Sequence, residues 1–182
     1  MPCTNSTLEA LIDAAHAAIA VRRGVPPPRP KQQPENERIY AWGTSLDFST
    51  RGNARRYFGP GWSDPEPAHC WTNGNSAELH LPVTPVEGTD LILTALLNPH
   101  VSTRTTAQLV RVSVNGNPTG QWLVRNPGPQ YITVFERHFA GKDRLTLHFD
   151  LPRAFSPQAH DLSADPRVLA LAFQSLSLCP VK

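Results

Sequence analysis

Long apolar runs and strong charge are what this sequence lacks most clearly. Its charged fraction is 18% and its formal net charge is +2, so no strong field favours nucleic acid or an anionic membrane surface. It contains no stretch of eighteen apolar residues, the length that a membrane-spanning helix needs. The N-terminus lacks the pattern of a secretory signal, because Glu9 and Asp13 interrupt its apolar stretch. We therefore expect a cytoplasmic protein with no membrane span and no nucleic-acid partner.

Cysteine is scarce as well. Cys3, Cys70 and Cys179 cannot all pair within the chain, and their spacing contains no CxxC motif. We interpret them as unpaired thiols in a reducing compartment. The histidines do not fall at metal-ligand spacing on one element, and the GxSxG, glycine-rich phosphate-loop and HExxH motifs are missing. The sequence thus predicts no metal, no cofactor and no enzymatic activity.

The N-terminal residues carry a helical pattern. Ser6 and Glu9 form a capping box, and apolar residues then recur at helical spacing, namely Leu8, Leu11, Ile12, Ala15 and Ile19. Residues 25–38 hold five prolines and almost nothing apolar, which is typical of a semi-rigid spacer. This pattern predicts an amphipathic helix in residues 1–24 on a proline-rich linker. Its apolar face could bind a partner or a second copy of the chain, or it could cover one edge of the domain that follows.

From residue 39 to the end the pattern is that of β-strands. The candidate strands are residues 39–48, 77–81, 91–97, 108–114, 121–124, 131–135, 144–151 and 168–178. Asn115-Gly116 is the pair favoured in a tight type I′ hairpin. The last strand changes phase, which predicts a bulge near Gln174 and Ser175. Eight strands without helices between them predict an all-β, antiparallel β-sandwich in residues 39–182, with jelly-roll topology as the first choice.

The segment of residues 59–81 holds the candidate ligand site. Its prolines and glycines exclude a helix or a central strand before residue 77. It also gathers two tryptophans with groups that bond hydroxyls, and the candidate ligand-binding residues are Trp62, Glu66, His69, Trp71, Asn73 and Asn75. A flat indole offers the apolar area on which a pyranose ring stacks. The alternative for each tryptophan is a plug that closes one end of the sandwich, with its N–H bonded to a backbone carbonyl. Trp42 and Trp122 fall in strand patterns and are expected in the core.

Two further features involve carboxylates. Glu66 could serve a glycan-acting enzyme as acid or base, but glycoside hydrolysis needs two carboxylates on opposite sides of the substrate. Asp64 lies in the same short loop and does not suit that geometry, and the distant Asp165 would do so only if the fold brings it together with Glu66. Asp165 and Arg167 precede the last strand, and we interpret them as a bidentate ion pair that fastens the connection, with Asp161 as another possible partner.

Three blocks of residues together resemble a known kind of module. The first is Gly61-Trp62-Ser63, Pro65-Glu66, Trp71-Thr72, Gly74 and Ala77-x-Leu79-x-Leu81; the second is the run from Gln108 to Gly116; the third is Phe155-Ser156-Pro157 with Asp165-x-Arg167-x-Leu169. The chain resembles a β-sandwich module, akin to carbohydrate-binding modules, that is found beside bacterial glycosyltransferases and polysaccharide-biosynthesis proteins. The resemblance covers about residues 46–178 and supplies no catalytic residues. It implies a non-catalytic, carbohydrate-binding-like accessory subunit of bacterial exopolysaccharide or cellulose synthesis. A protein-interaction scaffold that assembles through its N-terminal helix is the alternative.

Overall fold

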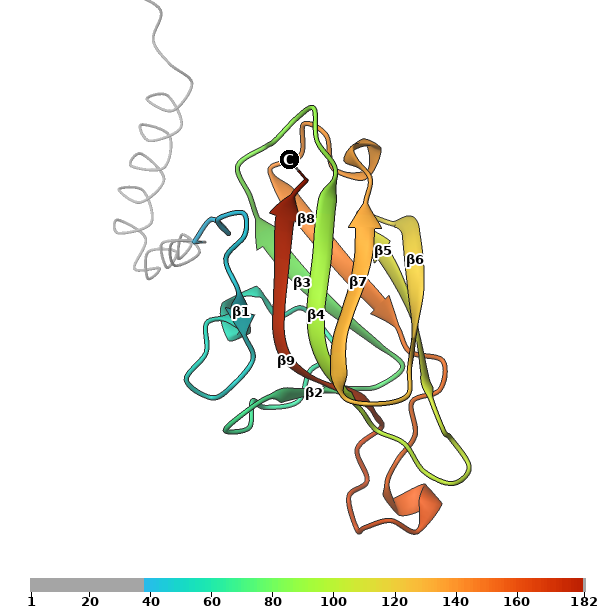
Figure 1. Cartoon of the computed structure of the whole chain (residues 1–182). Helices are drawn as coiled ribbons and strands as arrows, with labels where there is room; N and C mark the ends of the chain where they lie inside the picture. Colours follow the sequence, from blue (N-terminus) through green and yellow to red (C-terminus); the bar gives the residue numbers. More distant parts are fainter. Residues whose placement is uncertain (1–37, 182) are drawn as a thin grey trace, which may run out of the picture. The chain divides into compact units, whose positions relative to one another are not determined.

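The computed structural model describes residues 38–181, which form two antiparallel β-sheets (Figure 1). The five-stranded sheet contains β1 (Leu46–Asp47), β2 (Cys70–Asn73), β4 (Leu91–Pro99), β7 (Gly128–Val134) and β9 (Leu169–Pro180). The four-stranded sheet contains β3 (Ser76–Pro82), β5 (Gln108–Val114), β6 (Asn117–Val124) and β8 (Arg144–Asp150). Three short 3-10 helices, η1 (Ala54–Tyr57), η2 (Glu136–His138) and η3 (Gln158–His160), lie in the connections.

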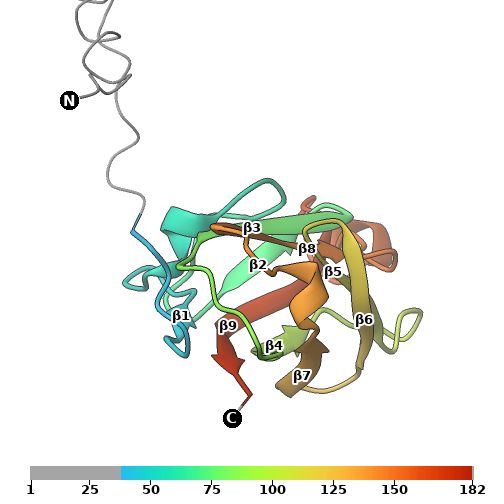
Figure 2. The same ribbon diagram turned by 90° about the horizontal axis from the view of Figure 1, so that it is seen from above.

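The chain passes between the two layers almost at every step. The strand orders are β1-β9-β4-β7, with β2 also paired to β9, and β3-β8-β5-β6. Between β2 and β9 only the β5–β6 hairpin joins neighbours within one sheet. Figure 2 shows the two layers from above. This repeated crossing is typical of a jelly roll, so the prediction of an antiparallel β-sandwich is confirmed.

The core lies between the sheets and follows from the period-two pattern. In β4, residues at alternate positions from Leu91 to Pro99 are buried, and the residues between them are half-buried on the outer face. In β8, Leu145, Leu147 and Phe149 are fully buried. Each such side chain contributes about 1.5 to 3 kcal/mol when it leaves water. A one-residue slip in any of these strands would turn its apolar set outward, so the pattern also fixes the register.

Two local predictions are confirmed. Asn115 and Gly116 have φ values of 50° and 79° between β5 and β6, as a type I′ turn requires. In β9 the register shifts by one residue, because Leu96 pairs with Ser175 and Leu97 pairs with Phe173. Gln174 is therefore the extra residue of the predicted bulge.

Two strand predictions were wrong. Residues 39–48 do not form one strand, because a turn that includes Gly43 interrupts them, and only Leu46–Asp47 pairs with β9. Trp42 consequently lies outside any strand, although it packs against the core, whereas Trp122 is buried as expected. The prolines and glycines of residues 59–76 also predict no helix or central strand there, yet β2 pairs with β9 through Cys70, Trp71 and Asn73.

The predicted N-terminal helix and most of its linker lie outside the described residues. This includes the apolar positions Leu8, Leu11, Ile12, Ala15 and Ile19. Within residues 38–181, no helix has the length and apolar character to cross a membrane.

Candidate functional site

The loop before β2 is held in place by its own backbone. Gly61 has a φ of +89°, and a Cβ at this position would collide with the backbone oxygen of Ser76. Asn73 N donates to Gly61 O (2.8 Å), and Ser63 N donates to Trp71 O (2.9 Å). Residues 61–63 thus run along the outer edge of β2, and glycine is required where the chain comes closest to β3.

Trp62 is a plug. Its indole Nε1–H donates to the backbone oxygen of Glu78 at 2.7 Å, and its ring centre lies 4.8 Å from that of Phe58, 5.2 Å from Phe48 and 5.0 Å from Phe173. The side chain is half-buried against the core. Of the two interpretations that the sequence left open for Trp62, its packing and its hydrogen bond fit the plug.

Trp71 has the opposite orientation. Cys70 and Thr72, its neighbours in β2, are buried, whereas Trp71 is half-buried. Because side chains alternate along a strand, Trp71 points to the outer face of the five-stranded sheet. The rings of His69 and His100 meet it edge-on, with centroids at 5.5 Å and 5.8 Å. Trp71 is therefore a surface aromatic bordered by two imidazoles.

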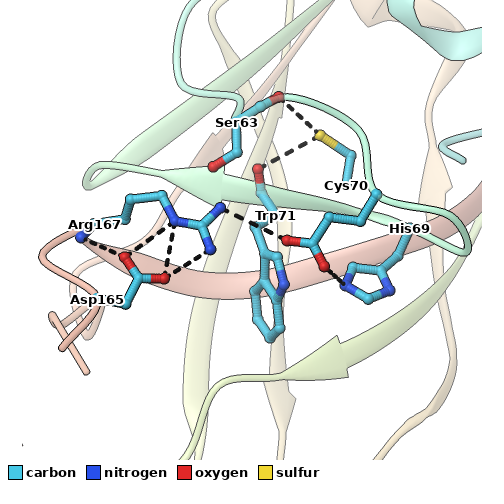
Figure 3. Close-up of polar contacts among 7 residues, drawn as sticks. Ser63, His69, Cys70, Trp71, Asp165 and Arg167 are labelled. Carbon is cyan, nitrogen blue, oxygen red and sulfur yellow. Dashed lines mark hydrogen bonds and ion pairs between the residues drawn. The ribbon is translucent and has the colours of Figure 1, made fainter. Parts of the chain in front are cut away.

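Beside Trp71 lies a cluster of charged groups that joins two distant parts of the chain (Figure 3). Arg167 donates to both carboxylate oxygens of Asp165, since its Nε lies 3.1 Å from Oδ1 and 3.0 Å from Oδ2, and its Nη2 lies 2.7 Å from Oδ2. Its Nη1 lies 3.7 Å from Glu66 Oε1. The second Glu66 oxygen lies 3.1 Å from His69 Nε2, close enough for an ion pair when the imidazole is protonated. Figure 3 shows Arg167 and Asp165 on one side of Trp71 and His69 on the other.

The predicted bidentate fastener is thereby confirmed. The hydrogen bonds from Arg167 hold the pKa of Asp165 below its usual range, and the same bonds raise the pKa of Arg167. Asp161 does not take part, since it lies 3.8 Å from Arg104 instead. The sequence alone predicts only a structural role for Arg167. Its contact with Glu66 also places it in the candidate site.

An open groove of about 700 Å³ adjoins this cluster. Its lining includes Arg55, Trp62, Asp64, Glu66, Asn73 and Arg167. Arg55 and Asp64 form an exposed ion pair at 3.3 Å. Glu66 and Arg167 belong both to the groove and to the surroundings of Trp71, so they are the centre of the candidate site.

The six predicted ligand residues therefore divide into groups. Trp62, Glu66 and Asn73 line the groove, and Glu66 also joins His69 beside Trp71. Asn75 is exposed in the turn before β3 and is not part of the groove lining. The structure thus brings five of the six close together, but the two indoles do not share one binding surface.

Cys70 lies beneath this site, and its thiol is expected to be unreactive. Burial, with the nearby charges of Glu66 and Asp64, raises the pKa of its thiol to about 12. Its Sγ donates to the backbone oxygen of Ser63 at 3.2 Å. Across residues 38–181, no three His, Cys, Asp or Glu side chains gather closely enough to hold a metal ion.

Comparison with known proteins gives a fold and no family. No protein-family model and no curated protein sequence matches the chain. Among solved structures, the CBM22-1 xylan-binding domain of Paenibacillus barcinonensis Xyn10C is similar, with a TM-score of 0.51 and 10% identity over 76% of this chain and 94% of that domain. The chain shares its fold with this carbohydrate-binding module.

Two other similar structures have lower scores. One is a CBM36-1 domain of a multidomain xylanase from the hindgut metagenome of Trinervitermes trinervoides, with a TM-score of 0.39 and 14% identity over 76% of this chain and 98% of that domain. The other is a GH115 4-O-methyl-alpha-glucuronidase, with a TM-score of 0.47 and 12% identity over 80% of this chain. This chain spans only 18% of that enzyme's length. The CBM22-1 domain, with its TM-score of 0.51, confirms the expected carbohydrate-binding-module type of β-sandwich at the level of fold.

Proposed function

We propose that the chain is a non-catalytic glycan-binding module in which a sugar ring stacks on Trp71. The observation that carries the proposal is the outward placement of Trp71 directly beside the fixed carboxylate of Glu66. An indole supplies apolar area for the face of a sugar ring, while neighbouring polar groups bond its hydroxyls. The fold shared with a xylan-binding domain supports the same role.

The charged groups of the site suit the recognition of hydroxyls. Glu66 accepts hydrogen bonds and is held by Arg167 on one side and His69 on the other. Asn73 is exposed in the groove and can both donate and accept. Because Glu66 is fixed before the ligand arrives, little conformational entropy is lost on binding. Trp62 supports the loop from below and need not contact the sugar.

The same contacts argue against catalysis. Asp64 pairs with Arg55, and both Asp165 and Glu66 contact Arg167. Glycoside hydrolysis needs two carboxyl groups that face the scissile bond, one of them as a proton donor. Each of these carboxylates is instead engaged with a cation.

The test is glycan binding by the full chain, with a glycan array followed by calorimetry on the best ligand. Trp71→Ala and Glu66→Gln should each weaken binding by about tenfold or more, the loss of one stacking or charged contact. Glu87→Gln is a matched control, because Glu87 is exposed in the β3–β4 loop outside the site. Unchanged affinity in both site variants would contradict the proposal. Release of reducing sugar that Glu66→Gln abolishes would show an enzyme instead.

We extend the proposal to an accessory role in bacterial exopolysaccharide or cellulose synthesis in the cytoplasm. Its support is the resemblance of the sequence blocks to modules found beside polysaccharide-synthesis proteins. Residues 1–24 would recruit the partner or a second copy of the chain through their apolar positions. Deletion of residues 1–24 should abolish partner pull-down and leave glycan affinity unchanged. If assembly persists in the deleted chain, neither the accessory role nor the scaffold alternative works through this segment.

A further inference from the structure

The outer face of the five-stranded sheet carries no charged side chain over three strands. The outward residues are the alternate positions of residues 92–96 in β4, 129–133 in β7 and 175–179 in β9. All are apolar, hydroxyl-bearing or thiol-bearing residues. We call this surface the uncharged face. Asp47 of β1, opposite Ser175, is the charged residue at its edge.

The outer face of the other sheet is different. Its outward positions include Glu78 on β3, Arg111 on β5, and Arg144 and Asp150 on β8. Charged residues such as these are usual on the solvent side of a sheet, where they keep it soluble and prevent edge pairing. Because the four-stranded sheet has charged residues on its outer face, their absence from the uncharged face is particular to the five-stranded sheet.

Tyr131 is the exposed aromatic of the uncharged face. It is 62% exposed, and the strand register places it in one row with Thr94 of β4 and Ser177 of β9. Its backbone oxygen accepts the indole N–H of Trp122 at 2.9 Å, so the strand is anchored while the ring is free. The row thus presents a phenol ring followed by two hydroxyls.

Trp71 lies on the same side of the same sheet. It pairs with Ala172 of β9, and Ala172 pairs with Asn98 of β4. From Thr94 to Asn98 is about 13 Å along the strand, and from β7 to β2 is about 14 Å across three strand spacings. The two aromatic side chains therefore mark two corners of one surface, about 19 Å apart on the diagonal.

We infer that the uncharged face binds a neutral polysaccharide that extends from Trp71 to Tyr131. The inference rests on the proposed glycan binding at Trp71 and names the ligand class, an uncharged polymer longer than the Trp71 site alone. A neutral polymer needs no ion pairs, and the Asp47 carboxylate at the edge would repel a polyanion. Hydroxyls at Thr94, Ser177 and their neighbours can bond the hydroxyls of the polymer.

The composition of the face favours a polysaccharide over a protein. The cores of protein interfaces are rich in Tyr, Trp, Phe, Met and Arg and are poor in serine, and Tyr131 is the single residue of those enriched types on the uncharged face. Here Ile92 and Leu96 are half-buried, Leu96 pairs with Ser175, and the row of Thr94 between them ends in Ser177. Tyr131 is the large exposed side chain of the uncharged face, beside the smaller exposed side chains of Pro129 and Cys179.

The experiment compares polymers with short fragments on the full chain. The probes are soluble neutral polymers (mixed-linkage β-glucan, arabinoxylan and galactomannan), the polyanion alginate, and short oligosaccharides of the neutral polymers. Tyr131→Ala and Thr94→Lys should weaken binding of a neutral polymer by about tenfold and leave short-oligosaccharide binding at Trp71 unchanged. Tyr131→Phe keeps the ring and should retain polymer binding. Ser113→Lys places the same charge on the outer face of the other sheet and is the matched control.

Each alternative outcome is distinct. Polymer affinity that is equal in wild type, Tyr131→Ala and Thr94→Lys overturns the inference, as does binding of none of the neutral polymers. Alginate binding that depends on Tyr131 would overturn the neutral class. If Thr94→Lys dissociates a dimer in sedimentation velocity and polymer binding is unaffected, the face is a self-association surface and the inference is wrong. If the wild type binds no short oligosaccharide, the proposed function at Trp71 is refuted, whatever the result for the polymers.

Discussion

The Trp62→Ala variant should have a melting temperature about 12 °C below that of the wild type. The indole is half-buried among Phe48, Phe58 and Phe173, so its truncation falls at the lower end of the range for aromatic-to-alanine changes, about 3 kcal/mol. The lost hydrogen bond does not orphan its acceptor, because Glu78 O also accepts from Gly59 N at 3.0 Å. At roughly 4 °C per kcal/mol for a domain of this size, the loss corresponds to about 12 °C.

Trp71→Ala is the matched comparison. Trp71 is half-buried too, but it is not packed against the hydrophobic core and meets two imidazole rings in T-shaped contacts, so we expect a loss of only about 1 kcal/mol, or roughly 4 °C. Glycan affinity should show the opposite order, with a larger loss in Trp71→Ala than in Trp62→Ala. Trp62→Phe keeps the ring, gives up a hydrogen bond of about 1 kcal/mol and should bind sugar as the wild type does.

Thermal melts followed by circular dichroism, with calorimetry on the folded variants, measure both effects. If Trp62→Ala melts within about 2 °C of the wild type, the ring is not a plug. If Trp62→Phe loses glycan binding while Trp71→Ala retains it, the assignment of the two tryptophans is reversed.

Further predictions concern pH, backbone geometry and thiol chemistry. Burial, with the charge of His160, lowers the pKa of His100 in the folded state. The unfolded chain therefore takes up the proton first, and stability should fall as the pH drops below about 6.5. The urea midpoints at pH 7.5 and 5.5 should differ less in His100→Asn than in the wild type, and an equal difference would show that His100 is not responsible. Gly61→Ala should give little folded protein in expression and melting assays, because the residue has positive φ and its Cβ would meet the backbone of Ser76; a wild-type melting temperature would count against this. Cys70 should resist Ellman's reagent at pH 8 until the protein unfolds, while exposed Cys179 reacts at once; peptide mapping distinguishes the two.

Strong alternation explains which strands the sequence could predict. The run from Leu145 to Phe149 repeats apolar and polar residues in strict order, and the strand is found where the pattern places it. The turn at Asn115-Gly116 is predictable for a similar reason, since few other residue pairs adopt positive φ at two consecutive positions. Both signals are local, so they can be read without knowing the rest of the fold.

Long-range pairing explains what the sequence could not predict. β2 has only four residues, and it is a strand because β9 lies beside it. The site depends on the same pairing, because it turns Trp71 outward and brings Arg167 next to Glu66, about a hundred positions earlier in the chain. Tyr131 belongs to a predicted strand, yet only the sheet register shows that its row lacks charge. These features depend on which strands become neighbours.

The extra residue at Gln174 has a consequence for how β9 tolerates change. On one side of it Leu171 and Phe173 face inward, and on the other Leu176 and Leu178 do so. Deleting Gln174 would put these four side chains at strictly alternate positions, so a regular strand without the bulge could keep all four of them inward. A deletion between Leu176 and Leu178 would instead turn one of the two leucines to solvent. An alignment of homologous chains through this strand should therefore allow a one-residue gap at residues 174–175.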